Sequence, residues 1–174
     1  SLMIKLNLGC GPDIKKDYIN IDTCPFNDSV IQSDIRNLSV LPNSVDEIYA
    51  KDILEHLSIS DAKKAIKNWS TICKSGALLF IQTICIDLII EAYQKGIWNL
   101  EVMNYMLFAG KNWVDGISKN EDFHKSCYSK NLLESILIPN DFVINSIEYD
   151  KIDKDLINNP YSHNLNIMIT ASKK

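Results

Sequence analysis

Two glycines and an aspartate near the N-terminus have the types and the spacing of a nucleotide-binding turn. Residues 5–22 read KLNLGCGPDIKKDYINID, so a strand-like run leads into Gly9-Cys10-Gly11 and a second strand-like run ends at Asp22. Glycine lets a ligand approach the backbone closely because no Cβ intervenes. An acidic residue at the end of the second strand can accept hydrogen bonds from two ribose hydroxyls. The pattern therefore predicts a site for a nucleoside-containing cofactor at the carboxyl edge of a parallel sheet.

The link between those two runs separates two classes of cofactor. The dinucleotide fingerprint is G-x-G-x-x-G, with an acidic residue about twenty positions later. Here Ile14 stands at the third glycine position, and Asp22 follows Gly9 by thirteen residues. The intervening PDIKKDY leaves room for about one helical turn, whereas a bound pyrophosphate uses a helix N-terminus. We therefore expect a nucleoside without phosphates rather than a nicotinamide dinucleotide.

The rest of the sequence predicts the elements that hold this turn in place. The clearest helix is 58–76, where Ser58 and Asp61 have capping-box spacing and Gly76 supplies the stop. The apolar run 77–83 is typical of a strand buried on both faces of a parallel sheet. The other expected strands are 3–8, 18–22, 30–34, 46–50, 141–150 and 165–172. The other expected helices are 87–95, 100–109 and 129–137, and 111–125 is expected to be a polar loop. This order predicts an α/β fold with both faces of the sheet covered.

Composition limits the class of protein. The 174 residues fit one domain, which we expect to span 1–174, and the hydrophobic content of 46% supplies a sizeable core. The net charge of −4 gives no bias toward nucleic acid, so we do not expect a nucleic-acid partner. The five cysteines include no C-x-x-C pair, which favours reduced thiols in a cytoplasmic protein over a disulfide framework. There is no N-terminal signal pattern, and the longest apolar stretch, 77–90, is too short and too polar to span a membrane.

Five stretches, taken in order, resemble the class I S-adenosylmethionine-dependent methyltransferases. KLNLGCGP resembles the first motif of that family, and YINID resembles its second strand with the ribose-binding acid. SDIRNLSVLPNSVDEIYAKDILEHL resembles the segment from an adenine-side aspartate to the fourth strand, and WSTICKSGALLFIQT resembles the fifth-strand region. EDFHKSCYSKNLLESIL resembles a late segment of small, type 11-like members whose substrate is unassigned. Together these stretches cover residues 3–150.

The resemblance implies a fold, a cofactor and a set of contacts. The fold is Rossmann-like, a mostly parallel seven-stranded sheet with helices on both faces, an antiparallel last strand and a shortened first crossover. The cofactor is S-adenosyl-L-methionine. The implied cofactor-binding residues are Asn7 (support of the turn), Gly9, Cys10 and Gly11 (backbone along the methionine and ribose), Asp22 (ribose hydroxyls), Asp34 and Ile35 (adenine), and Ala50 and Lys51 (methionine). The family often has Pro-Gly-Gly where this chain has Ser75-Gly76, and the short crossover leaves the cofactor either more exposed or dependent on 84–125 as a cover.

Histidines are the candidates for the chemical step. A sulfonium is already a good methyl donor, so the protein must align the acceptor and exclude water. A hydroxyl acceptor also benefits from a general base, and His56 and His124 are the candidate catalytic residues. His56 follows Glu55 just beyond the fourth strand, and its alternative role is a structural hydrogen bond. His124 lies in a polar loop, and its alternative role is that of a surface residue. We do not expect His163 to take part.

Two further features leave alternatives open. Glu121, Asp122 and His124 could suggest a metal site, but one histidine with two carboxylates in a loop is more typical of solvated charge, so we expect no metal. A group rich in aromatic residues and methionine forms either a core or a lid over the substrate, where a ring could face the sulfonium. Its members are Trp98, Met103, Tyr105, Met106, Phe108 and Trp113.

Together these features predict an enzyme of EC class 2.1.1. We expect a methyltransferase that uses S-adenosylmethionine and methylates an oxygen or nitrogen of a small-molecule or sugar-like acceptor. One alternative is a nicotinamide-dependent oxidoreductase, which a third glycine and a longer crossover would have favoured. The other is a scaffold of the same fold that binds the cofactor without turnover.

Overall fold

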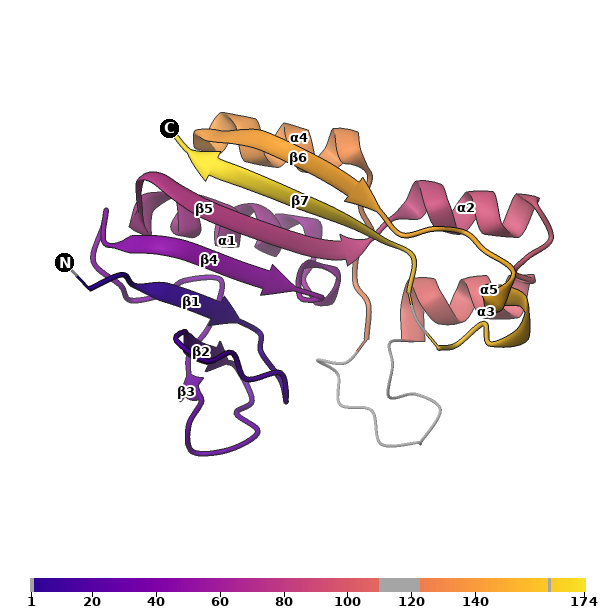
Figure 1. Cartoon of the computed structure of the whole chain (residues 1–174), viewed down its shortest axis with the longest axis horizontal. Helices are drawn as coiled ribbons and strands as arrows, with labels where there is room; N and C mark the ends of the chain where they lie inside the picture. The colour runs from indigo at the N-terminus through magenta and orange to yellow at the C-terminus, as the bar shows by residue number, and fades with distance from the viewer. Residues whose placement is uncertain (1, 110–122, 163) are drawn as a thin grey trace.

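Seven strands form a single sheet in the order β3-β2-β1-β4-β5-β7-β6 (Figure 1). The computed structural model describes residues 2–109, 123–162 and 164–174. The strands are β1 (Lys5–Leu8), β2 (Ile19–Asp22), β3 (Ile31–Gln32), β4 (Val45–Lys51), β5 (Cys73–Ile84), β6 (Phe142–Tyr149) and β7 (Asn166–Lys173). Neighbouring strands are parallel except at β7, which runs antiparallel to both β5 and β6. The expected mostly parallel sheet with an antiparallel last strand is confirmed.

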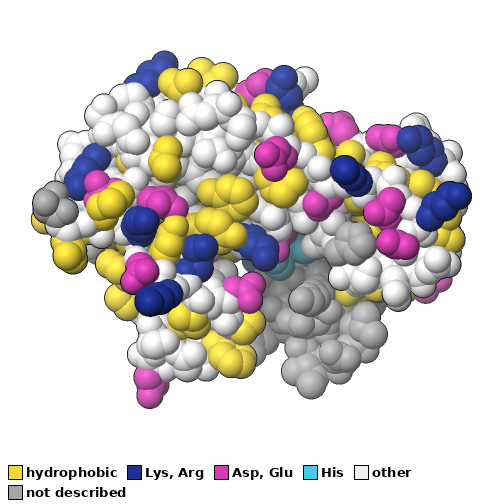
Figure 2. Space-filling view, viewed as in Figure 1, with side chains coloured by type: hydrophobic (Ala, Val, Ile, Leu, Met, Phe, Trp, Pro, Cys, Tyr) yellow, Lys and Arg dark blue, Asp and Glu magenta, His cyan; other side chains and the backbone are white. Residues whose placement is uncertain are grey.

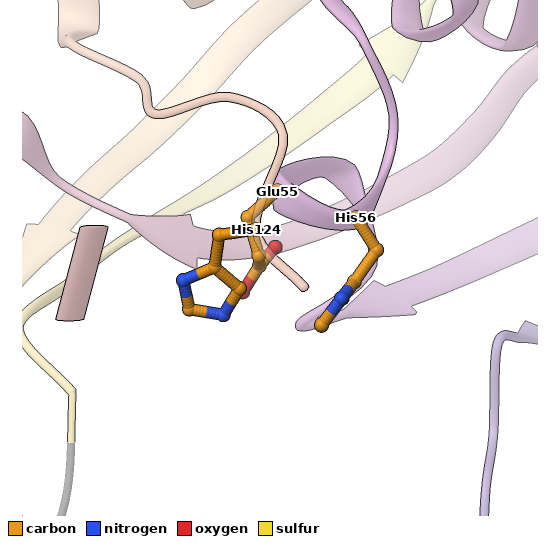
Figure 3. A group of neighbouring side chains, drawn as sticks. All are labelled: Glu55, His56 and His124. Atoms are coloured by element: carbon orange, nitrogen blue, oxygen red, sulfur yellow. The ribbon is translucent and has the colours of Figure 1, made fainter. Parts of the chain in front are cut away.

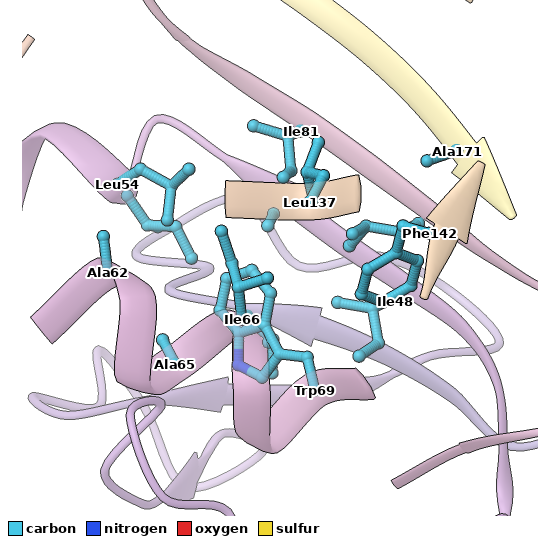
Figure 4. Close-up of a cluster of buried hydrophobic side chains, with 14 of the residues drawn as sticks. Ile48, Leu54, Ala62, Ala65, Ile66, Trp69, Ile81, Leu137, Phe142 and Ala171 are labelled. Atoms are coloured by element: carbon cyan, nitrogen blue, oxygen red, sulfur yellow. The ribbon is translucent and has the colours of Figure 1, made fainter. Parts of the chain in front are cut away.

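The main core lies between the sheet and two helices, α1 (Ile59–Ile72) and α4 (Lys130–Leu137). The α1 helix begins where the Ser58 side chain accepts a hydrogen bond from the Asp61 backbone N–H at 3.1 Å, as the capping pattern predicts. Its apolar stripe contacts the sheet through Ile66 and Trp69, which meet strand residues such as Ile48 in Figure 4. Full burial of such a side chain contributes about 1.5–3 kcal/mol. The layer of apolar contacts therefore fixes the position of β4 and of its carboxyl end.

The opposite face of the sheet is more open. The described helices that pack on the sheet, α1 and α4, share one face (Figure 1), whereas cover was expected on both. On the open face the rings of Tyr49 and Phe80 stack at 4.7 Å between centroids, and Lys15 Nζ lies 4.1 Å from the Tyr49 centroid. Figure 2 looks onto this face and shows apolar side chains gathered over β4 and β5 with lysines beside them. Stacking and a cation–π contact thus occupy part of the space that a helix would cover.

The first crossover is short because side-chain hydrogen bonds replace a helix. Asn7 on β1 donates from Nδ2 to the Asp13 carbonyl at 2.9 Å and to Asn20 Oδ1 at 2.8 Å. Asn20 on β2 also accepts from the Lys15 backbone N–H at 2.9 Å and donates to the Lys15 and Tyr18 carbonyls. Both amides are buried. Two asparagine side chains therefore satisfy the backbone of the loop that helical hydrogen bonds would otherwise satisfy.

A smaller second core lies beyond the carboxyl end of β5. Figure 1 shows α2 (Ile86–Gln94), α3 (Leu100–Asn104) and α5 (Asp155–Asn158) grouped there, and α3 continues as a π-helix, η2 (Tyr105–Ala109). The members of the aromatic and methionine-rich group that are buried in this cluster are Trp98, Tyr105 and Met106. They form core rather than a lid. Phe108 is 60% exposed, and Trp113 lies outside the described residues.

The bounds of α1, β5 and β3 differ most from the expectation. The helix expected over 58–76 ends at Ile72, and β5 begins at once at Cys73. Gly76, expected as the helix stop, lies inside β5 with a φ of 81°, where the register with β4 jumps between its pairings with Cys73 and with Leu78. The glycine therefore serves an irregular stretch of strand. The third strand is shorter than expected, and α5 was not predicted.

The longest described helix, α1, has 14 residues, and none of the helices in the described ranges combines the length and apolar character needed to cross a bilayer.

Candidate cofactor and acceptor site

The glycine turn after β1 is held by two different constraints. Gly9 has a φ of 60°, and a Cβ placed on it would lie 2.1 Å from Ile53 Cγ2, so only glycine fits against the segment after β4. Gly11 has a φ of 49°, but a Cβ placed on it would meet no protein atom within 4 Å. The space over Gly11 is therefore open, as a turn that receives a ligand requires.

Asp22 lies at the end of β2 and faces this turn. Its Oδ2 accepts a hydrogen bond from the Gly11 backbone N–H at 2.8 Å, and its Oδ1 accepts from the Cys24 backbone N–H at 2.8 Å. Each carboxylate oxygen can accept two hydrogen bonds. One acceptor position on each oxygen thus remains for a ligand, and the two bonds already made fix the orientation of the carboxylate.

A cavity of about 640 Å³ brings most of the predicted adenosine contacts together. The predicted residues that line it are Gly9, Gly11, Asp22, Asp34, Ile35 and His56. The residues that sequence reasoning did not single out are Thr23, Cys24, Arg36, Asp52, Ile53, Leu57 and Lys125. The main chain of Ile35 is itself held in place, because its carbonyl accepts a hydrogen bond from the buried Trp69 indole at 2.8 Å.

Asp34 has a partner that the sequence did not indicate. Its two carboxylate oxygens accept hydrogen bonds from the Arg36 guanidinium at 2.8–3.2 Å. The side-chain hydrogen bonds from Arg36 lower the pKa of the Asp34 carboxyl below its usual value. A contact between Asp34 and an adenine amino group therefore has to share this carboxylate with Arg36 or displace the guanidinium.

A second cavity of about 530 Å³ adjoins the first. Gly9, Gly11, Asp52 and His56 line both. The second cavity is also lined by the predicted residues Asn7, Cys10, Lys51 and His124, and by Glu55. Ala50 lines neither of these two cavities and is fully buried, so only its backbone could border a ligand.

Asp52, at the junction of the two cavities, was missed by sequence reasoning. It follows β4 directly in a left-handed conformation with a φ of 56°. Its backbone N–H donates to the Gln82 carbonyl at 2.9 Å, and its Oδ1 accepts from Gln82 Nε2 at 2.9 Å. Burial raises the pKa of this carboxyl. The one available signal was a polar residue directly after a buried parallel strand, where ligands bind in α/β folds.

Glu55 is a fully buried carboxyl group that the sequence pattern also did not indicate as a site residue. It lies in η1 (Leu54–His56), a short 3-10 turn, with 0% of its side chain exposed. Its Oε2 accepts a hydrogen bond from the Thr83 hydroxyl at 2.8 Å. Its Oε1 is buried without a hydrogen-bond partner among the described residues. Burial, and then the charge of Asp52, raises the pKa of Glu55 to about 8.

The two candidate catalytic histidines lie next to each other. The His56 and His124 rings are 5.0 Å apart between centroids and nearly perpendicular, at 72°, with Glu55 beside them (Figure 3). His124 is 8% exposed, and its Nδ1 lies 2.7 Å from the Met106 carbonyl. Because a carbonyl oxygen only accepts, this nitrogen carries the proton and Nε2 carries the lone pair. This histidine is buried rather than a surface residue, and its burial lowers its pKa.

Main-chain hydrogen bonds hold the two segments of this group together. The Glu55 carbonyl accepts from the Lys125 N–H at 2.7 Å and from the Ser126 N–H at 3.2 Å. The buried Tyr128 hydroxyl donates to the Leu54 carbonyl at 3.1 Å. The segment that carries His124 is thereby fixed against η1. Glu121 and Asp122, considered with His124 as a metal site, lie outside the described residues, as does His163.

Comparisons with known proteins place this arrangement in context. Residues 10–81 match the family model described as a methyltransferase domain. An S-adenosylmethionine-dependent methyltransferase from Methanosarcina mazei is similar with a TM-score of 0.69 and 15% identity, over 99% of this chain and 93% of that one. A magnesium protoporphyrin IX methyltransferase from Synechocystis, solved with bound S-adenosylhomocysteine, gives 0.62 and 11%, over 99% and 74%. A geranyl diphosphate C-methyltransferase from Streptomyces coelicolor, also solved with S-adenosylhomocysteine, gives 0.60 and 11%, over 99% and 72%.

A comparison with curated proteins found no match. The matches to solved structures establish the Rossmann-like fold of the methyltransferases. With the methyltransferase domain model over 10–81, they confirm the predicted resemblance to the class I S-adenosylmethionine-dependent methyltransferases. The roles of individual residues toward a cofactor or an acceptor stay predictions.

Proposed function

We propose, on the premise that residues 10–81 form a methyltransferase domain, that this chain transfers a methyl group from S-adenosylmethionine to a small-molecule or sugar-like acceptor. Methylation would occur on an oxygen or a nitrogen of the acceptor. The observation that carries the proposal is the pair of adjoining cavities that meet at Gly9, Gly11, Asp52 and His56. One cavity is suited to a nucleoside and the other to an acceptor.

The residues of the first cavity fit the cofactor. The free acceptor positions of Asp22 would bind the two ribose hydroxyls, and such a charged hydrogen bond contributes about 1.5–3 kcal/mol. The open space over Gly11 leaves room for the ribose and methionine portion. Asp34 and Ile35 would contact the adenine. The methionine would extend toward the second cavity, where Cys10 and Lys51 and the backbone of Ala50 would border it. Asn7 would support the turn through its bonds to Asp13 and Asn20.

The residues of the second cavity would act on the acceptor. When bound, the sulfonium of S-adenosylmethionine supplies an electrophilic methyl group. His124 Nε2, which carries a lone pair, would accept the proton of an acceptor hydroxyl, and His56 would contact the acceptor beside it. The buried wall formed by Glu55 and His124 would exclude water from one side of the reacting groups. An amine acceptor already has a lone pair, so it would need to be aligned with the methyl group more than it would need a general base.

The first test is cofactor binding. We expect calorimetry to show binding of S-adenosylhomocysteine, and Asp22→Ala to weaken it at least tenfold, which corresponds to about 1.4 kcal/mol. The matched control is Asp87→Ala, which removes the same charge from an exposed position in α2 outside both cavities. Equal affinity of Asp22→Ala and the control would contradict the placement of the ribose.

The second test is turnover. Radiolabelled S-adenosylmethionine offered with sets of sugars, phenols and amines should label at least one class of acceptor. Tight cofactor binding without transfer to any acceptor would support a non-catalytic scaffold instead. Binding of NADH at micromolar concentration would support the oxidoreductase, although the crossover that follows the glycine turn contains no helix to hold a pyrophosphate.

The expected partner and compartment belong to the same proposal. A small-molecule acceptor suits a cavity of about 530 Å³. All five cysteines are free thiols, in line with the reducing cytoplasm predicted from their spacing. A single domain over 1–174 remains the expected organisation.

A further inference from the structure

We propose that Glu55, His56 and His124 bind a divalent transition-metal ion, with zinc as the reference ion, at the acceptor cavity. One ligand atom from each of the three residues lies within 4.8 Å of the other two. Figure 3 shows Glu55 and His56 projecting from one turn and His124 approaching from a separate segment. All three line the second cavity, so a bound ion would have a side open to a ligand.

The types of ligand fit this class of ion. Two imidazole nitrogens and one carboxylate oxygen leave one position open for water or substrate, the arrangement of catalytic zinc sites. Other ions that imidazole suits, such as iron, cobalt and nickel, accept the same donors. Ligands at 2.0–2.1 Å from a tetrahedral ion lie about 3.3 Å from one another. Side-chain rotations that move each ligand atom by a distance on the order of 1 Å would bring the three ligand atoms to that spacing.

The partners of two of the ligands orient them for this role. His124 donates from Nδ1 to the Met106 carbonyl at 2.7 Å, which leaves Nε2 as the nitrogen able to bind an ion. Glu55 accepts from the Thr83 hydroxyl at 2.8 Å through Oε2. Metal-binding histidines and carboxylates characteristically have such second hydrogen bonds, which set the ring orientation and the ligand geometry.

One oxygen of the group lacks a partner. Glu55 Oε1 is fully buried and has no hydrogen-bond partner among the described residues, and leaving such an acceptor unsatisfied is costly. Thr83 satisfies only the other oxygen. A cation between Glu55 and the histidines would interact with Oε1 directly. A purely structural role of this carboxyl group would not explain why Oε1 is buried without a hydrogen-bond partner among the described residues.

Main-chain hydrogen bonds hold the scaffold around the group. The Glu55 carbonyl accepts two backbone N–H bonds, from Lys125 and Ser126, and these residues follow His124 directly. The ligands from the two segments are therefore held side by side by main-chain contacts. The sequence expectation of no metal considered Glu121 and Asp122 with His124, whereas the structure offers Glu55 and His56 instead.

The ion would also define the acceptor, and this step rests on the proposed function. With the ion bound, His124 Nε2 would be a ligand and no longer the general base. The remaining position of the ion would face the cavity that adjoins the glycine turn, where it would bind an acceptor hydroxyl oxygen, lower the pKa of that hydroxyl and let its proton pass to water. The expected acceptor is then a molecule with a hydroxyl group rather than a simple amine.

The experiment is a titration of the metal-free protein with Co²⁺, followed by calorimetry and by optical absorption, without any methyl donor. We expect one equivalent to bind, with the spectrum of nitrogen and oxygen ligation and without the charge-transfer band of a thiolate. Glu55→Gln and His124→Asn should each weaken binding at least tenfold. Asn at 124 keeps a donor near the position of Nδ1 and removes Nε2. The matched control Glu91→Gln, on the exposed side of α2, should bind like the wild type.

Circular dichroism of each variant establishes that it is folded, and His56→Asn provides a second histidine variant should His124→Asn be unfolded. Absence of Co²⁺ binding by the wild type, or equal affinity of folded Glu55, His56 and His124 variants and the control, would overturn the site. A thiolate spectrum that survives these substitutions would assign the ion to cysteine and overturn it as well. Cofactor binding is measured separately, so its failure would contradict the proposed function and leave the metal result standing.

Discussion

Asn7 Nδ2 on β1 donates a hydrogen bond of 2.8 Å to Asn20 Oδ1 on the adjacent strand β2, and the same oxygen accepts the Lys15 backbone N–H at 2.9 Å. This pair of buried amides closes the loop that carries the glycine turn. It is the physical reason why Asp22 follows Gly9 by only thirteen positions in a fold that usually places a helix between two parallel strands.

The first prediction concerns this amide pair. Asn20→Ala removes the acceptor of the buried Asn7 Nδ2–H and of the part-buried Lys15 backbone N–H, and a buried donor left unsatisfied costs about 1–3 kcal/mol. We therefore expect the free energy of unfolding in urea to fall by about 2–4 kcal/mol, and the affinity for S-adenosylhomocysteine to fall with it. Asn104→Ala, which removes an exposed amide on α3, should change the free energy of unfolding by less than about 0.5 kcal/mol. Equal effects of the two substitutions would show that the pair does not hold the crossover.

The second prediction concerns the contact between Gly9 and Ile53. Gly9→Ala introduces a Cβ 2.1 Å from Ile53 Cγ2 in addition to an unfavourable φ of 60°. We expect a loss of about 3 kcal/mol or more, the sum of overpacking and left-handed strain. Gly11→Ala, whose Cβ would meet no atom, should lose only about 1–2 kcal/mol.

A double-mutant cycle separates the two causes. In an Ile53→Ala background the 2.1 Å contact with Cγ2 is gone and only a tight contact with the Cβ, 3.1 Å away, remains. Gly9→Ala should therefore cost less there than in the wild type, approaching the about 1–2 kcal/mol expected for Gly11→Ala. Urea denaturation of the four proteins of the cycle measures this coupling. If Gly9→Ala costs the same in both backgrounds, the glycine is required by its backbone conformation alone and not by packing.

The sequence reasoning placed the elements with a strong apolar pattern and missed those set by long-range contacts. The continuous apolar run after α1 was correctly predicted as strand, but Gly76 was interpreted as a helix stop because a glycine in a strand irregularity has the same local signature. Glu55 lies among residues that resemble a helical turn, and its burial follows only from the return of the chain at His124. No periodicity links those two residues, since they are neighbours through the topology of the sheet.

The candidate site also has a part that the sequence predicts and a part that depends on long-range contacts. Gly9, Gly11 and Asp22 lie together as the motif predicts, because the carboxyl ends of adjacent parallel strands share an edge. Asp34 and Arg36 are two positions apart, so their ion pair was one of many possible contacts between close neighbours. The sequence did not indicate which of these contacts forms. The second cavity depends on Asp52, Glu55 and His124, which come from two distant parts of the chain, and local patterns carry no information about their distance.

The third prediction concerns Asp34. The ion pair with Arg36 depresses the pKa of Asp34, so its contribution to stability is fully present above the unfolded pKa, near 3.8, and is lost as the pH falls through the lower folded value. Asp34→Asn should therefore make the free energy of unfolding less steeply dependent on pH below 3.8. The pair is nearly half exposed, so the effect should be small and weaker in high salt. An unchanged slope would mean that the pair is not formed in solution.

Arg36 offers a matched test of the cofactor contact. Arg36→Met frees the Asp34 carboxylate and removes the competing guanidinium. If Asp34 binds the adenine amino group, this variant should bind S-adenosylhomocysteine as tightly as the wild type or more tightly, whereas Asp34→Ala should bind it several-fold more weakly. Weaker binding by Arg36→Met, with Asp34→Ala unchanged, would assign the adenine contact to the arginine instead.

The last prediction concerns Tyr18, which lies on the open face of the sheet and donates its hydroxyl hydrogen bond to Glu47. Burial, followed by this bond to a carboxylate, raises the pKa of Tyr18 to about 12. Ionisation would remove the donor and place a phenolate against Glu47, so the folded state retains the proton that the unfolded state loses near the usual value of 10. Stability from this pair is therefore complete below pH 10 and falls as the pH rises toward 12.

Tyr18→Phe removes that dependence and keeps the ring that lies edge-on to Tyr49. We expect the variant to lose less stability than the wild type between pH 10 and 12, measured by urea denaturation, and to lack one late step in an ultraviolet titration of tyrosine. Tyr93→Phe, at an exposed position of α2, is the matched control and should keep the wild-type loss of stability over this pH range. If Tyr18→Phe also keeps that loss, the Tyr18 hydroxyl is solvated, and the hydrogen bond to Glu47 does not order this face of the sheet.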